Sequence, residues 1–147
     1  MSLKSLIDKA LSKQSLVKPS RTKQRNAQPE AIEQEKVIKW ARDNENNYPF
    51  LWLLHSSLNG VKLSKNQAGR AKTQGMLSGV PDLFLPVPKN GFHGLYIEMK
   101  SEKGRVSVSQ NRFLSVTNEL GYQSIVCYSS EDAIQKIKEY LKNANHG

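Results

Sequence analysis

A glutamate and a lysine stand two residues apart in the segment 95–100, whose other residues are mostly apolar. Side chains alternate between the two faces of a β-strand, so Glu98 and Lys100 would project side by side from one face. Charged groups are costly to bury unless they are paired or bind a metal ion. The pattern is typical either of a catalytic centre or of a solvated edge strand that carries a surface ion pair.

An aspartate opens the preceding apolar segment, directly after a Gly-Val-Pro turn at 79–81. A short, turn-rich connection at 86–94 joins the two segments, which we expect to pair as a hairpin. This pairing would bring Asp82 close to Glu98, and two converging carboxylates suit a hard cation such as Mg²⁺ or Mn²⁺. Zinc fits less well, because the three histidines are scattered and form no cluster with the cysteine.

A divalent ion at this place would activate water, polarise a phosphoryl oxygen and neutralise the charge that grows on a leaving oxygen. Lys100 would then position the nucleophile or stabilise the charge of the transition state, and both roles stay open. Taken alone, Asp82 is better explained as a turn residue that caps its bend. Only the meeting of Asp82 with Glu98 favours phosphodiester hydrolysis.

The charge balance indicates a polyanionic partner. The chain has 147 residues, with 22 Lys and Arg against 13 Asp and Glu and a formal net charge of +9. Such a surplus favours nucleic acid, because neutralised phosphates release counterions, although a basic surface that only aids solubility is an alternative. No apolar run approaches the ~20 residues of a membrane-spanning helix, and no signal peptide is visible. The single cysteine, Cys127, lies in an apolar run and is interpreted as a core residue, so we expect an intracellular protein without a membrane partner.

Hydrophobic spacing and turn residues predict the remaining elements. Residues 1–28 are basic and contain a short amphipathic helix and a polar linker, which either grips a DNA backbone or is disordered without it. The folded domain is expected at 29–147. Apolar strands are predicted at 50–55, 83–85, 95–100 and 123–128, and helices at about 29–42, 64–74, 107–120 and 131–142. Their order predicts an α/β fold with a mixed central sheet and helices on both faces.

Pro81-Asp82 followed by Glu98-Met99-Lys100 resembles the PD-(D/E)xK nuclease signature, which is short. The surrounding residues are more specific and resemble the virus-type replication-repair nuclease (VRR-NUC) family over about 30–142. The residues that carry this resemblance are Glu30, Gln34, Trp40, Asn59-Gly60, Gly75, Gly79–Leu83, Gly94–Lys100, Ser109-Gln110 and Phe113-Leu114. The resemblance implies a restriction-endonuclease-like core.

By this resemblance, Asp82 and Glu98 would bind Mg²⁺ or Mn²⁺, and the backbone carbonyl of Met99 would complete the metal's shell. Lys100 would be the catalytic lysine. Gln110, on the helix that follows, would hold this lysine or a water. For Gln110 the alternative is an ordinary polar residue near the start of a helix.

A further acidic residue on the first helix would reach the site, and two glutamates compete for this role. Glu30 is preferred because its four-residue spacing to Gln34 matches the family pattern, while Glu33 lies about one helical turn away. Exposed basic residues would bind backbone phosphates without reading bases, unless they only form a solvated face. The candidates for this role are Lys65, Arg70, Lys72, Lys103 and Arg105.

Stand-alone domains of this kind resemble viral and phage proteins, which would place this chain in a host cytoplasm. The resemblance implies a homodimer that acts in DNA repair on branched DNA, with Holliday junctions as the leading substrate. Three alternatives are a non-enzymatic DNA-binding module with the same fold, a flap nuclease and a restriction-type nuclease.

Overall fold

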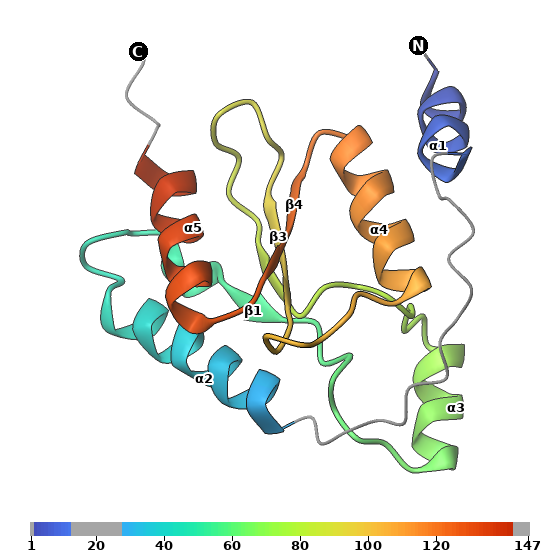
Figure 1. The fold of residues 1–147 in the computed structure, drawn as a ribbon, viewed down its shortest axis with the longest axis horizontal. Coiled ribbons are helices and arrows are strands. Elements are labelled where there is room, and N and C mark those ends of the chain that lie inside the picture. Colours follow the sequence, from blue (N-terminus) through green and yellow to red (C-terminus); the bar gives the residue numbers. More distant parts are fainter. Residues whose placement is uncertain (1, 13–27, 143–147) are drawn as a thin grey trace.

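The computed structural model describes residues 2–12 and 28–142, and its centre is a four-stranded sheet (Figure 1). The strands lie in the order β1-β2-β3-β4. Neighbours pair antiparallel from β1 to β3, whereas β3 and β4 are parallel. The sheet is therefore mixed, as predicted. The strands are β1 (His55–Ser56), β2 (Leu83–Leu85), β3 (Leu95–Met99) and β4 (Gln123–Cys127).

Helices cover both faces of this sheet, which confirms the predicted α/β architecture (Figure 1). The second and fifth helices pack against each other and against β3, while the fourth packs against β4 from the other face. Parallel strands need such a crossover helix, and the fourth helix connects β3 to β4. The helices are α1 (Leu3–Ser12), α2 (Gln28–Asp43), α3 (Lys65–Thr73), α4 (Val108–Glu119) and α5 (Ser130–Lys142), with a short 3₁₀ helix η1 (Leu51–Leu53).

The alternation of β3 separates a hydrophobic core from the candidate site. Ile97 and Met99 are buried in the core between the sheet, α2 and α5, where each fully buried side chain contributes about 1.5–3 kcal/mol. The opposite face carries Tyr96, whose ring stacks on Phe84 with 4.2 Å between centroids. The edge of Phe113 from α4 meets the same ring at 5.1 Å. Glu98 shares this second face and so points toward α4.

The segment 50–55 is not the continuous strand that its apolar run predicted. Leu51 and Leu54 are fully buried, whereas Trp52 between them is 60% exposed. Burial at every third residue fits the three residues per turn of η1, and only the last residue joins β1. The Arg42 guanidinium also donates hydrogen bonds of 2.8–3.2 Å to the carbonyls of these three residues, which a strand would pair with a neighbour.

The N-terminal helix expected within residues 1–28 is present as α1, which lies against α4. The linker from 13 to 27 lies outside the described residues, so its role and the domain boundary at 28/29 stay predictions. Within the described part of the chain, no helix is long and apolar enough to cross a membrane. Cys127 is fully buried in β4, and burial raises the pKa of its thiol to about 12, as suits a core residue.

Candidate active site

The hairpin of β2 and β3 brings the two predicted acids together. Its register pairs Leu83 with Ile97, so the residues just before and after them, Asp82 and Glu98, lie opposite each other. The Asp82 carboxylate also accepts a hydrogen bond of 2.8 Å at Oδ2 from the Met99 backbone amide. The aspartate is thus held across the strand pair, next to the Glu-x-Lys segment.

The turn before Asp82 is fixed from two sides. Gly79 has a φ of +87°, and a Cβ there would lie 2.4 Å from the carbonyl oxygen of Ser109 in the first turn of α4. Only glycine allows both this conformation and this approach. From the other side, the Asn59 amide donates a 3.0 Å hydrogen bond to the Val80 carbonyl. These contacts set the position at which Asp82 enters the sheet.

Glu98 is almost completely buried, with 2% of its surface exposed. Its Oε1 accepts a hydrogen bond of 2.6 Å from Gln110 Nε2 and lies 3.2 Å from Lys100 Nζ. The other oxygen, Oε2, is buried and has no hydrogen-bond partner, and no other side-chain atom of the described residues is in this state. An unsatisfied buried carboxylate oxygen is costly, which suggests that a ligand completes it.

The Gln110 side chain makes two hydrogen bonds at the start of α4, one within the helix cap and one to Glu98. Its Oε1 accepts a hydrogen bond of 2.8 Å from the Ser107 amide, and the Ser107 hydroxyl accepts one from the Gln110 amide, which completes a capping box. This leaves Nε2 for Glu98. Gln110 was predicted to hold Lys100 or a water. It does not contact the lysine here, because the cap turns its amide nitrogen toward the carboxylate that Lys100 also contacts, and its contact with a water stays a prediction.

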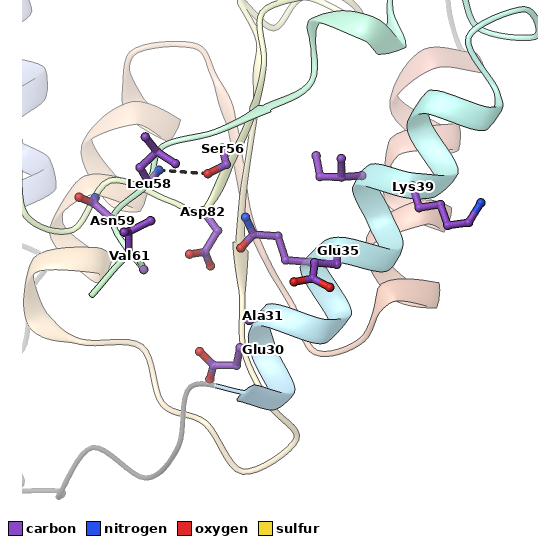
Figure 2. Close-up of a pocket in the computed structure, with 12 residues that line it drawn as sticks. Glu30, Ala31, Glu35, Lys39, Ser56, Leu58, Asn59, Val61 and Asp82 are labelled. Atoms are coloured by element: carbon purple, nitrogen blue, oxygen red, sulfur yellow. Dashed lines mark hydrogen bonds between the residues drawn. The ribbon is translucent and has the colours of Figure 1, made fainter. Parts of the chain in front are cut away.

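The two candidate glutamates of α2 have different surroundings. Glu30 accepts a hydrogen bond of 3.1 Å from the Ser101 amide, and it projects into the same space as Asp82 (Figure 2). Glu33 instead pairs with Lys36 at 2.7 Å and accepts a hydrogen bond from the first residue of α5. The hydrogen bonds from Lys36 and α5 lower the pKa of Glu33 to about 2. This carboxylate therefore stabilises the packing of α2 against α5.

Charge in the site is unbalanced. Burial raises the pKa of Glu98 to about 7, and the Asp82 carboxylate adds to this effect while Lys100 opposes it. Burial also raises the pKa of Asp82 against the opposing effects of the Met99 amide and Lys100. Glu30 raises the pKa of both acids. One lysine does not compensate three neighbouring carboxylates, so the arrangement favours a bound cation.

Comparison with known proteins identifies the family of this domain. The family model of the VRR-NUC domain matches residues 27–131. The chain belongs to the VRR-NUC domain family. A solved structure described as a VRR_NUC domain protein is similar with a TM-score of 0.66 and 24% identity, over 78% of this chain and 89% of that chain. At this identity the likeness shows the shared fold, and no curated protein matches the chain.

The VRR-NUC family is a family of nucleases, so the chain carries a DNA-binding nuclease domain. Nucleases of this kind generally depend on a divalent metal ion. The predicted resemblance is thus confirmed, together with the restriction-endonuclease-like core that it implied.

The VRR-NUC site offers oxygen donors that fit such an ion. Glu98 has its unpartnered Oε2, and Asp82 Oδ1 has no hydrogen-bond partner among the described residues. The N–H and C=O of one strand residue point to the same side. Because the Met99 N–H points to Asp82, its carbonyl also faces that side. Two carboxylate oxygens and a carbonyl are hard donors of the kind that Mg²⁺ and Mn²⁺ prefer.

Glu30 lies beside this donor set without completing it. Across the described residues, no three His, Cys, Asp or Glu side chains form a group that could hold a metal ion. The hydrogen bond to the Ser101 amide holds Glu30 beside the lysine end of the segment. Its role as a ligand stays a prediction, and it would require this hydrogen bond to break or to be shared.

The raised pKa of Glu98 predicts how the metal-free VRR-NUC domain responds to pH. The folded protein binds the Glu98 proton more tightly than the unfolded chain, whose value is 4.5. This contribution to the free energy of unfolding is fully present below pH 4.5, and is lost as pH rises through about 7. We expect a loss of about 3 kcal/mol, measured by urea unfolding in EDTA between pH 4.5 and 8. Glu98→Gln should lack this component, and an equal pH dependence of both proteins would contradict the assignment.

All five basic residues predicted to bind phosphates are exposed. Three lie on α3, which begins with its own capping box at Ser64 and Gln67, and two lie in the loop between β3 and α4. In the described part of the chain, none of the five forms an ion pair that would occupy its charge. Their role in DNA binding stays a prediction for Lys65, Arg70, Lys72, Lys103 and Arg105.

Two residues support the site in ways that the sequence pattern did not reveal. Asn59 was noted only as part of the family pattern, and it ties the loop after β1 to the turn before Asp82. Ser101 was not noted, and its amide holds Glu30. Both act through hydrogen bonds between a side chain and the backbone of a distant segment, which leave no local signal in the sequence.

Proposed function

We propose that the protein is a Mg²⁺- or Mn²⁺-dependent endonuclease that hydrolyses phosphodiester bonds in branched DNA, with Holliday junctions as the leading substrate. The observation that most supports this is the buried Glu98, which keeps one oxygen unpartnered beside Asp82 and Lys100. An unpartnered buried carboxylate oxygen is costly because its desolvation is not compensated, which supports a bound ligand at this atom. Membership of a nuclease family supports a role of this ligand in DNA cleavage.

Asp82, Glu98 and the Met99 carbonyl would hold the ion. When bound, it would supply Lewis-acid activation of water and of the scissile phosphate. Gln110 keeps Glu98 oriented, because its amide nitrogen holds Oε1 at 2.6 Å and leaves Oε2 for the ion. The position of both carboxylates is therefore set before DNA binds, as preorganised catalysis requires.

Lys100 would act on the phosphate side of the site. Its Nζ lies 3.2 Å from Glu98 Oε1, and its side chain is 11% exposed. An ammonium group has three donors, so one contact with Glu98 leaves donors for a water or a phosphoryl oxygen. It would hold the attacking water or stabilise the charge that grows on the phosphate.

A homodimer would suit a four-way junction, since resolving it requires two cuts on opposing strands. Each copy of the chain would contribute one site. The basic surface of α3 and of the loop after β3 would hold the arms through backbone phosphates, so the selectivity would come from DNA shape.

Cleavage assays test the proposal. Labelled four-way junction, 5′ flap and plain duplex are incubated with the protein in Mg²⁺, Mn²⁺, Ca²⁺ or EDTA, and its mass in solution is measured by light scattering. We expect metal-dependent cutting that favours the junction and a loss of about 10³-fold in Asp82→Asn, which removes a ligand charge. Asp43→Asn, an exposed change at the far end of α2, should cut normally.

Binding of all three DNAs without cutting under every metal condition would instead support the non-enzymatic module. Preference for the flap, or cutting of plain duplex at one fixed sequence, would overturn the junction assignment and leave the nuclease in place. A monomer that cuts junctions would overturn the homodimer alone.

A further inference from the structure

A cavity of about 460 Å³ opens beside Asp82, between α2 and the loop that follows β1 (Figure 2). Glu30 and Asp82 both line this cavity. Ala31 and Gln34 line it from α2. The segment 56–61 forms the facing wall. The cavity is therefore continuous with the candidate catalytic carboxylates but extends well beyond them, and its size falls in the ~300–1,000 Å³ range of sites for small ligands.

The loop wall presents apolar side chains to solvent. Leu58 is 63% exposed and Val61 is 51% exposed, and both line the cavity. Leu58 has a φ of +62°, a conformation that is unfavourable for a bulky residue and that burial does not offset here. The segment is nevertheless held in place, because Asn59 bonds the Leu77 and Val80 carbonyls. An apolar side chain is thus kept exposed, at a cost, next to the catalytic centre.

The charge of the cavity excludes a phosphate as its occupant. Glu30, Glu35 and Asp82 line it, and an anion would be repelled by these carboxylates. Lys39, the cation of the lining, points away from Asp82 and Glu30 (Figure 2). It pairs with Asp43 one turn along the helix, with 2.6 Å between Nζ and Oδ2. The lining suits a neutral planar group with an apolar face and with N–H donors at its edge.

Gln34 supplies a polar contact in the α2 wall. Its side-chain amide has no hydrogen-bond partner among the described residues. An amide can both donate to and accept from the edge of a base, while Leu58 and Val61 contact the ring face. Together they form the kind of pocket in which enzymes hold a nucleotide that has left the stack.

We propose that this cavity receives one unpaired nucleobase of the DNA, adjacent to the phosphate that is cut. This inference rests on the proposed function, and it explains how that function could select branched DNA. Unstacking a base is least costly where pairing is already interrupted, so a nuclease that must seat a base cuts branched DNA in preference to duplex. Leu58 and Gln34 are then specificity-determining residues rather than catalytic ones.

The test combines a protein variant with a DNA variant. Leu58→Gly removes the apolar side chain, and glycine favours a positive φ, so the fold is not endangered. Ile32→Ala is the matched control, since Ile32 is an aliphatic residue of α2, 51% exposed, that does not line the cavity. The position of the cut in a four-way junction is first mapped with wild-type protein. Each protein is then tested on junctions in which one nucleotide near that position is replaced by an abasic residue.

We expect Leu58→Gly to lower kcat/KM on the intact junction about tenfold, the scale of one lost base contact. One abasic position should lower wild-type cutting by a similar factor, and Leu58→Gly should add no further loss there, because both changes remove the same contact. Ile32→Ala should behave as wild type. Independent losses at every abasic position, or unchanged cutting by Leu58→Gly, would overturn the inference.

A binding measurement separates this inference from the proposed function. 2-Aminopurine at the sensitive position should brighten when wild-type protein binds in Ca²⁺, and should brighten much less with Leu58→Gly. Cutting of junctions with no change in fluorescence would overturn the base pocket alone. Brightening without cutting in Mg²⁺ or Mn²⁺ would support the pocket and overturn the nuclease.

Discussion

Glu98→Gln is expected to abolish DNA cleavage, with a loss on the order of 10³-fold in kcat/KM, while the protein remains folded. The variant removes the charge that would hold the metal ion but keeps the shape of the side chain. Gln110 can still donate to the new amide oxygen, since this hydrogen bond is made to Oε1 at 2.6 Å. The measurement is single-turnover cutting of a labelled junction in Mn²⁺, in parallel with circular dichroism.

The same substitution should leave stability unchanged or raise it in metal-free buffer at pH 8. Glu98 is 2% exposed, and its Oε2 has no partner, so the ionised form is costly to bury. Glutamine carries no charge, so its burial does not require the desolvation of an ionised group. Cutting within tenfold of wild type would exclude Glu98 as a ligand. A lower unfolding temperature than wild type would mean that the carboxylate is structural.

Local sequence patterns were enough to predict where the two acids meet. The alternation of residues 95–100, the turn at 79–81 and the short connection between the segments specify a hairpin, and a hairpin fixes which residues face each other. Asp82 and Glu98 follow directly from that register. The same reasoning gave helix α4, which begins at Val108 after its Ser107 cap, because the apolar spacing and a stop at Gly121 are local signals.

The roles that failed or were missed depend on contacts between distant segments. Gln110 was predicted to hold the lysine or a water, and its contact with Glu98 was missed, because three-dimensional packing decides that one amide atom serves the cap and the other serves Glu98. The positive φ of Leu58 is equally invisible, since leucine is not a residue that predicts such a turn. The apolar run at 50–55 was ambiguous because short apolar runs do not distinguish a strand from a helical turn.

Lys100→Met should impair both stability and cleavage, and the two losses have separate causes. The side chain is 11% exposed, and its Nζ lies 3.2 Å from a carboxylate that is itself buried. Removing one partner of a buried pair leaves an uncompensated charge. Because the pKa of Glu98 is already about 7, its carboxyl can take up a proton at pH 8, which limits the cost to about 1–2 kcal/mol. At pH 8 in EDTA this predicts an unfolding temperature about 5 °C below wild type. Lys136→Met, an exposed change on α5, should leave both properties unchanged.

The double variant Glu98→Gln/Lys100→Met distinguishes these causes. With a neutral residue at position 98, no buried charge is left without its partner, so most of the lost stability should return. Cleavage by the double variant should stay at least about 10³-fold below wild type, because it lacks both the ligand charge of Glu98 and the ammonium group on the phosphate side. A double variant as unstable as Lys100→Met would show that the lysine stabilises the fold through its packing. If Lys100→Met cut DNA at the wild-type rate once folded, the lysine would serve only to compensate Glu98, and the charge on the phosphate would have to be stabilised by another group.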